Sequence, residues 1–391
     1  MSSFATFVLA KTSCSSNPKL LVTRCTLCDI FMKKLKIDNY IGCIVGGAIG
    51  DALGAPTEFM RLDNILEKYG SNGVNDYVEY DNGFGEITDD TQMLLFTAEG
   101  LLRSWHRATI KGIWGAYSTI CYESYLRWLK TQNDWFGDNA LCHLKLDGWL
   151  INERFLHKRR APGATCLSAL RTGIPGTLEN PINNSKGCGG IMRIAPVGLL
   201  FYNDPENAFK IGNELAAMTH GHPSGYLSAG YLAALIAYIN SGKNLMDSIK
   251  ETSKLLITYD QHEETLASVE NALELHALHN PNYKQLETLG EGWVGEEALS
   301  ISLYCCLSYE NDFEKAINLA INHSGDTDST GAITGNILGL LLGEKAIPNR
   351  WIINLMNYQT IKQIGEDIHT EVKGNGYDQF DNEWEQKYPT C

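Results

Sequence analysis

Apolar residues recur at helical spacing along most of the chain, beginning at Ile37. The stretch from Leu215 to Ile239 reads as two helices separated at Pro223, and the second is apolar on nearly every side, which is typical of a buried helix. The stretch from Gly331 to Leu342 has the same character. Segments that alternate with period two are few, and β-branched runs between hairpin turns are scarce. The pattern predicts an all-α fold without internal repeats.

Two of the predicted helices begin with polar runs that are rich in carboxylates and hydroxyls. Thr88-Asp89-Asp90-Thr91 precedes an apolar helical run, and residues 322–331 open the buried helix that follows them. A single Thr or Asp would suffice to cap a helix and to complement its dipole. Adjacent like charges are costly to fold unless hard cations hold them, and oxygen ligands suit Mg²⁺, Mn²⁺ or Ca²⁺. The two distant runs therefore predict one shared metal site, with helix capping alone as the simpler alternative for Thr88 or Asp89.

The second polar run also matches the opening of a calcium-binding EF-hand loop, because Asp326, Asp328 and Thr330 alternate before a glycine. Position 12 of such a loop would be Ile337, where a bidentate Glu is required. The residues that follow also have the pattern of a buried helix. The sequence therefore argues against an EF-hand.

Composition is that of an ordinary soluble globular protein. The chain has 391 residues, 44% of them hydrophobic and 20% charged, which is enough for one large domain or two smaller ones. The formal net charge is −14, so broad contact with nucleic acid or an anionic membrane is opposed by electrostatics. No apolar stretch approaches the roughly 18–20 residues that a membrane helix requires. We expect neither nucleic acid nor a membrane as a partner.

The 11 cysteines are scattered, and Cys25 and Cys28 form the only pair with C-x-x-C spacing. No second pair of matching type accompanies them, and a chain of this length does not need disulfides for stability. Cys305 and Cys306 lie within an apolar helical pattern. We expect buried reduced thiols and, with them, a cytoplasmic location.

The first 36 residues differ from the rest of the chain. They contain six basic side chains and a single acid, Asp29, among many Ser and Thr residues. A targeting peptide, a partner-binding arm, a disordered leader and an alternative start at Met32 are all compatible with this composition. A secretory signal is not, because no continuous apolar region lies between the basic residues. We expect an N-terminal extension over residues 1–36, outside a catalytic domain over residues 37–391.

Three further motifs accompany the two acidic runs: residues 46–59 (GGAIGDALGAPTEF), 187–193 (GCGGIMR) and 219–226 (THGHPSGY). All five stand in the order seen in ADP-ribosylglycohydrolases, and the chain closely resembles that family, which includes the dinitrogenase-reductase-activating glycohydrolases, over about residues 40–365. The resemblance implies a single compact orthogonal helical bundle of the ADP-ribosylglycohydrolase type. It also implies a binuclear centre of two Mg²⁺ or Mn²⁺ ions at the base of an ADP-ribose cleft.

Carried over position by position, the resemblance implies metal ligands at both acidic helix starts, namely Thr88, Asp89, Asp90, Asp326, Asp328 and Ser329. Asp89 or Asp90 would also orient or deprotonate a water, and Glu58 aligns with an acid that gates or supports the metal site in some relatives. A surface carboxylate is the alternative for Glu58, and a core tryptophan is the alternative for Trp293. The substrate contacts implied by the motifs are Gly187, Gly189, Gly190, Met192, His220, Gly221, Ser224, Tyr226, Gly292 and Trp293.

The motif variants are more similar to those of arginine-specific members of the family than to those of serine-specific members. We therefore expect metal-dependent hydrolysis of the N-glycosidic bond between ADP-ribose and protein arginine, with an ADP-ribosylated protein as substrate. Arginine-type relatives include bacterial immunity proteins, so a cognate ADP-ribosyltransferase toxin is a further expected partner, blocked by the basic extension. The alternatives are hydrolysis of another ADP-ribosyl linkage, a toxin inhibitor that acts by occlusion, a catalytically silent binding protein and a metal phosphohydrolase.

Overall fold

The computed structural model describes residues 36–78, 84–134, 144–373 and 382–390. Regular structure in these ranges is helical, with 17 α-helices and several short 3-10 turns but no β-strand. The all-α prediction is confirmed. The expected extension, residues 1–36, lies outside the described residues except for Lys36, so its role stays a prediction.

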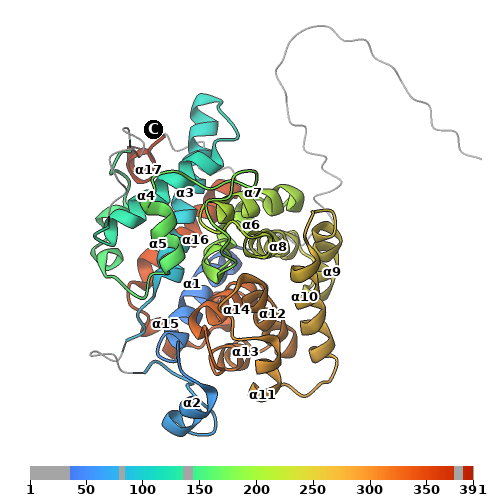
Figure 1. Cartoon of the computed structure of the whole chain (residues 1–391). Helices are drawn as coiled ribbons and strands as arrows, with labels where there is room; N and C mark the ends of the chain where they lie inside the picture. The colour runs from blue at the N-terminus through green and yellow to red at the C-terminus, as the bar shows by residue number, and fades with distance from the viewer. Residues whose placement is uncertain (1–35, 79–83, 135–143, 374–381, 391) are drawn as a thin grey trace, which may run out of the picture. The chain divides into compact units, whose positions relative to one another are not determined.

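The helices are numbered along the chain, as in Figure 1. Their bounds are α1 Ile37–Gly54, α2 Leu62–Tyr69, α3 Asp89–Lys111, α4 Tyr117–Thr131, α5 Ala164–Arg171, α6 Ala195–Leu200, α7 Pro205–Ala217, α8 Pro223–Asn240, α9 Leu245–Leu256, α10 Glu263–His276, α11 Tyr283–Leu286, α12 Gly295–Ser308, α13 Phe313–Ala320, α14 Thr327–Leu342, α15 Asn349–Ile353, α16 Tyr358–Val372 and α17 Asn382–Lys387. Within the described ranges, no helix combines the length and the apolar character that a membrane span needs.

α1 and α14 pack against each other at the centre of the helical domain (Figure 1). The two helices are antiparallel and meet backbone to backbone, because glycines recur every fourth residue on both facing surfaces. A Cβ atom on Gly50 would lie 2.0 Å from the carbonyl oxygen of Gly331, and one on Gly339 would lie 1.9 Å from the carbonyl oxygen of Gly42. No side chain fits at these distances. The close approach places the C-terminal end of α1 beside the N-terminal end of α14.

The helix predicted after Pro223 is present. α7 ends at Ala217, and α8 begins at Pro223, whose fixed φ and missing N–H suit the first helical position. The side chain of His222 caps α8 by accepting a hydrogen bond from the Ser224 N–H at 3.2 Å. As its apolar pattern predicts, α8 is buried along nearly its whole length, against α6, α7 and α12.

Six cysteines fall within the described residues, and none of them forms a disulfide. Five are buried, whereas Cys188 is partly exposed. The expectation of buried reduced thiols is confirmed for these five. Cys25 and Cys28 lie outside the described residues.

Candidate active site

The two acidic helix starts line one cavity of about 390 Å³. Its walls also include the turn after α1, the segment that leads into α5, and the glycine loop that precedes α6. The lining residues are Glu58, Phe59, Asp89, Asp90, residues 161–166, residues 187–189, Met192, His220, Trp293, Asp326, Asp328 and Ser329. The structure thus brings together two polar runs that are far apart in the sequence.

The start of α3 is held in place by a carboxylate from α1. Thr88 is the N-cap residue, and its hydroxyl accepts a hydrogen bond from the Asp90 N–H at 3.3 Å. The buried carboxylate of Asp51 accepts hydrogen bonds from the Thr88 N–H at 3.0 Å, the Thr91 N–H at 3.2 Å and the Thr91 hydroxyl at 2.5 Å. Sequence reasoning missed Asp51, although an acid inside an otherwise apolar helix indicates a buried, paired carboxylate.

Asp89 and Asp90 occupy the first turn of α3. One oxygen of Asp89 accepts a hydrogen bond from the Gly163 N–H at 3.0 Å. The Oδ2 atom of Asp90 is buried and has no hydrogen-bond partner within the described ranges. Burial raises the pKa of both carboxyls well above its ordinary value, and the charge of Asp328 raises it further. Because a buried polar atom is rarely left unpaired, this oxygen is a candidate contact for a bound cation.

The start of α14 carries the second acidic group. Asp326 is the N-cap residue, and its Oδ1 accepts a hydrogen bond from the Ser329 N–H at 3.4 Å. Its Oδ2 accepts a hydrogen bond from the Cys188 thiol at 2.7 Å. Asp328 accepts a hydrogen bond from the Ser329 N–H at 3.0 Å. These local contacts orient both carboxylates at the cavity wall.

Glu58 joins the acidic group from the turn after α1. The neighbouring Thr57 is fully buried, and its hydroxyl lies 3.0 Å from that of Thr327, so the turn is attached to the start of α14. Carboxylate oxygens of Glu58, Asp326 and Asp328 all lie within 4.8 Å of one another. Burial, followed by the charges of nearby acids, raises the pKa of Glu58 to about 9. Glu58 therefore lies beside this cluster, partly exposed at the cavity wall.

Oxygen donors dominate this end of the cavity. The acids with raised pKa values are Asp51, Glu58, Asp89, Asp90, Asp326 and Asp328. Carboxylates and hydroxyls are the ligands that hard divalent cations prefer. The Asp90 Oδ2 atom, which has no partner within the described ranges, would gain one in such a cation. The residues present therefore fit a site for divalent cations.

The glycine loop of residues 187–189 forms another wall. A Cβ atom on Gly189 would lie 2.8 Å from the sulfur of Cys166 and 2.9 Å from Cε1 of His220, so no larger residue fits there. The Cys188 N–H donates to the Trp293 carbonyl oxygen at 3.1 Å, which attaches the loop to the segment before α12. His220 is buried, and burial lowers its pKa to about 3. This wall therefore offers backbone and a neutral imidazole to a polar substrate.

Some predicted site residues lie just outside the cavity wall. This group consists of Thr88, Gly190, Gly221, Ser224, Tyr226 and Gly292. The Ser224 hydroxyl donates to the carboxylate of Glu264, which also pairs with Lys186 before the glycine loop. Gly221 lies against backbone, since a Cβ atom there would be 2.2 Å from the Asn183 carbonyl oxygen. In this structure these residues support the wall, and direct contact with substrate stays a prediction.

Two aromatic rings stack at the cavity. Phe59 and Trp293 have ring centroids 5.1 Å apart and planes 23° from parallel. Phe59 is 73% exposed and has a left-handed φ of 67°, which is uncommon for a bulky residue. Sequence reasoning placed Trp293 at the substrate but missed Phe59, because a stack between distant residues leaves no pattern in one sequence. It also missed Cys166 and residues 161–165, which no pattern indicated, and it did not single out Cys188 within the motif 187–193.

Comparison with known proteins finds relatives that are similar over most of this chain. ADP-ribosylarginine hydrolase Tri1 of Serratia proteamaculans is 26% identical over 85% of this chain and 79% of its own length. The ADP-ribosyl-(dinitrogen reductase) glycohydrolase of Rhodospirillum rubrum is 24% identical over 81% of this chain and 90% of its own length. A solved structure, named as an ADP-ribosylglycohydrolase-related protein complex, covers 86% of this chain and 98% of its own, with a TM-score of 0.61 and 22% identity. That likeness confirms the predicted fold type.

The family model described as ADP-ribosylglycohydrolase matches residues 32–378. This range includes all of the cavity residues and most of the chain. The protein therefore belongs to the ADP-ribosylglycohydrolase family.

Proposed function

We propose that the protein hydrolyses the N-glycosidic bond between ADP-ribose and an arginine side chain of a protein, with the help of divalent cations. The family acts on ADP-ribosylated substrates. The arginine linkage is supported by relatives named for it, such as the Serratia protein. The observation that carries the chemistry is the convergence of two acidic helix starts on one cavity, where the Asp90 Oδ2 atom has no hydrogen-bond partner in the described part of the chain.

Two Mg²⁺ or Mn²⁺ ions would be held by oxygen atoms at the two helix starts, beside Glu58. The proposed ligands are Thr88, Asp89, Asp90, Asp326, Asp328 and Ser329. When bound, the ions supply positive charge that binds the ribose hydroxyls and favours deprotonation of a water.

The side chains of the cavity have separate tasks in this proposal. Asp89 already accepts a hydrogen bond from Gly163, whereas the Oδ2 atom of Asp90 accepts none from the residues that the structure describes. Asp90 is thus the better placed of the two to orient the attacking water and to accept its proton. The remaining carboxylates stabilise the positive charge that develops on the ribose as the bond to the guanidine nitrogen breaks. The glycine loop lets a diphosphate approach the backbone closely.

An assay of ADP-ribose release tests the proposal. A protein that carries ADP-ribose on arginine is incubated with the enzyme and Mg²⁺, and free ADP-ribose is measured by chromatography. We expect release that a chelator abolishes and that Asp90→Asn lowers by about 10²–10⁴-fold, because the amide cannot act as a base. Substrates linked through serine serve as the comparison. Release from serine but not from arginine would replace the arginine linkage by another ADP-ribosyl linkage, and no metal-dependent release from either would overturn the proposal.

We also propose a setting for this activity, in which the protein counteracts an ADP-ribosyltransferase toxin in a reducing cytosol. The support is the resemblance to immunity proteins together with the charge of residues 1–36. That segment is basic while the chain as a whole is acidic, so it suits an acidic surface on a partner. Occlusion of the toxin by this segment would act in addition to hydrolysis.

A further inference from the structure

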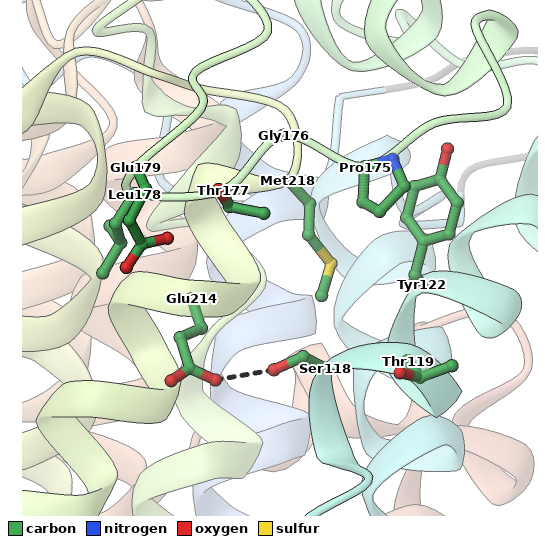
Figure 2. A pocket seen from close by; sticks show the side chains of 10 residues that line it. All are labelled: Ser118, Thr119, Tyr122, Pro175, Gly176, Thr177, Leu178, Glu179, Glu214 and Met218. Carbon is green, nitrogen blue, oxygen red and sulfur yellow. Dashed lines mark hydrogen bonds between the residues drawn. The ribbon is translucent and has the colours of Figure 1, made fainter.

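A second cavity, of about 370 Å³, lies between α4, α7 and the loop that follows α5 (Figure 2). It shares no lining residue with the acidic cavity. The residues that line it are Ser118, Thr119 and Tyr122 of α4, residues 175–179 of the loop, Glu214 of α7, and Met218, which directly follows α7. α5 connects the two cavities. Its first residues line the acidic cavity, and its last residue leads into the loop that lines the second cavity. The eight residues of α5 span about 12 Å.

The loop over this cavity has a defined conformation. The Gly176 N–H donates to the Met218 carbonyl oxygen at 3.1 Å, and a Cβ atom on Gly176 would lie 2.5 Å from the Ala217 carbonyl oxygen. The Thr177 N–H donates to the Asn180 carbonyl oxygen at 3.1 Å, and the Asn180 N–H donates to the Thr177 hydroxyl at 3.0 Å. The walls are therefore formed before any ligand binds, which lowers the entropic cost of binding.

The lining combines apolar surface with carboxylates. In Figure 2 the side chain of Met218 points into the space between Glu214 and Tyr122. One oxygen of Glu214 accepts a hydrogen bond from the Ser118 hydroxyl at 2.6 Å. Lys210 lies 4.0 Å from the other oxygen, but its side chain is 65% exposed, so this pair neutralises little of the charge. Glu179 adds a second carboxylate from the loop.

We propose that this cavity is a second ligand site, which binds a guanidinium group on an apolar stem, such as an arginine side chain. A guanidinium group is planar and weakly hydrated, so it can lie against Tyr122 and Met218 while its donors reach Glu214. An ammonium group is compact and strongly hydrated, so it loses more hydration free energy than a guanidinium group when it leaves water. An anion is opposed by both carboxylates.

The site gives the proposed reaction a means of target recognition. A protein substrate with a further arginine near the modified one would gain a second contact in this cavity. That use rests on the proposed function, whereas the binding of a guanidinium group does not.

Methyl groups of two methionines report on the two cavities separately, because Met218 lines the second cavity and Met192 lines the acidic one. Protein labelled with ¹³C at its methionine methyls is titrated with N-acetyl-arginine methyl ester, and Met218→Leu identifies the resonance. We expect a saturable shift of the Met218 signal while the Met192 signal stays in place. The matched citrulline ester, which is neutral, should give no shift, and the lysine ester should bind more weakly. The readout needs no catalysis, so it stands apart from the test of the hydrolase.

Two variants remove the lining charge. Glu214→Gln keeps the size of the side chain and should weaken binding of the arginine ester by about tenfold or more, because hydrogen bonds to charged groups are the stronger ones. Glu179→Gln removes the loop carboxylate without altering a helix and should weaken binding in the same direction. Glu206→Gln is the matched control, since Glu206 is an exposed acid on α7 outside the cavity.

The outcomes separate the possibilities. No saturable shift of Met218, equal binding of the citrulline ester, or the same loss in Glu206→Gln as in Glu214→Gln would overturn the proposal. A short arginine-containing peptide that binds more tightly than the ester would assign the site to protein arginine. Equal affinities would assign it to a small guanidinium compound.

Discussion

The carboxyl groups of the acidic cavity are individually unfavourable in the folded chain. Asp90 keeps a buried oxygen without a partner among the described residues, and burial raises the pKa of Asp51 to about 7 and that of Glu58 to about 9. A carboxyl that is protonated in the folded protein but ionised in the unfolded chain makes folding depend on pH. Divalent cations bind the ionised carboxylates of the folded protein, so they also shift the equilibrium between the folded and the unfolded state.

We predict that the cation-free protein loses stability as the pH rises from about 5 to about 9. The folded-state pKa values of Asp51 and Glu58 lie above those of unfolded carboxyls, so the folded state binds more protons in this interval and ionisation opposes folding. The loss is on the order of a few kcal/mol, and saturating Mg²⁺ should remove most of it. Thermal melts across this range, with and without Mg²⁺, measure the effect. A cation-free melting temperature that is flat or rises with pH would contradict it.

A second prediction concerns Asp51, which acts on the cavity through α3. Asp51→Asn keeps the size of the side chain but removes its charge and one of the acceptors that hold Thr88 and Thr91. We expect the affinity for Mg²⁺ to fall by about 10–100-fold, as for other groups that orient metal ligands. Calorimetric titration gives the affinity, and circular dichroism checks that the helices persist. Asp63→Asn, which alters an exposed acid on α2, is the control; unchanged Mg²⁺ affinity in Asp51→Asn would leave Asp51 with a structural role only.

Among the helices, the pair formed by α1 and α14 determines where the acids lie. The Thr327 hydroxyl donates to the Gly54 carbonyl oxygen at 2.9 Å, so the first turn of α14 is attached to the last turn of α1. The positive end of the α14 dipole favours the carboxylates of Asp326 and Asp328. Because Asp51 and Glu58 lie in and just after α1, any change in the spacing of the two helices moves all four acids.

We predict that Gly335→Ala forces α1 and α14 apart. The added Cβ would lie 2.0 Å from the carbonyl oxygen of Gly46. This clash should exceed the roughly 1 kcal/mol that Ala gains over Gly in a helix, for a net loss of at least about 1 kcal/mol. Chemical unfolding measures the loss. Gly163→Ala is the control, since its Cβ would meet nothing closer than 3.8 Å, and equal stability of the two variants would show that the helix pair tolerates wider spacing.

For the whole molecule, we propose that the helical domain and the basic extension are separable in function. Both cavities consist of residues from Glu58 onward, and the family model begins at residue 32. We therefore expect the hydrolase chemistry not to require residues 1–36. An arm for partner binding is our proposal for them.

Deletion of residues 1–36 tests this separation. We expect the melting temperature and the release of ADP-ribose to stay unchanged, because no cavity residue is lost. Affinity for a cognate ADP-ribosyltransferase should fall by about tenfold or more, and salt should weaken binding of the full chain, because the segment is basic. Surface plasmon resonance measures the affinity of the full chain and of the shortened chain for the transferase. Unchanged affinity would discard the arm, and lost hydrolysis would place the segment in the catalytic domain.

Local patterns are enough for the sequence by itself to determine the helices and the polar residues at their ends. Thr88 and Asp326 could be placed at helix starts because capping involves neighbouring residues only. The break before Pro223 and the burial of α8 follow from a fixed φ and from apolar residues on every side. The family motifs added which segments lie near the cavity.

Only the tertiary structure decided which distant groups meet and which way they face. Asp51 accepts hydrogen bonds from the start of α3, Phe59 stacks on Trp293, and the Ser224 hydroxyl donates to the carboxylate of Glu264. Helical periodicity describes one element at a time, so it carries no information on the packing between elements. Burial and neighbouring charge, which set the pKa values of the acids, arise from that packing alone.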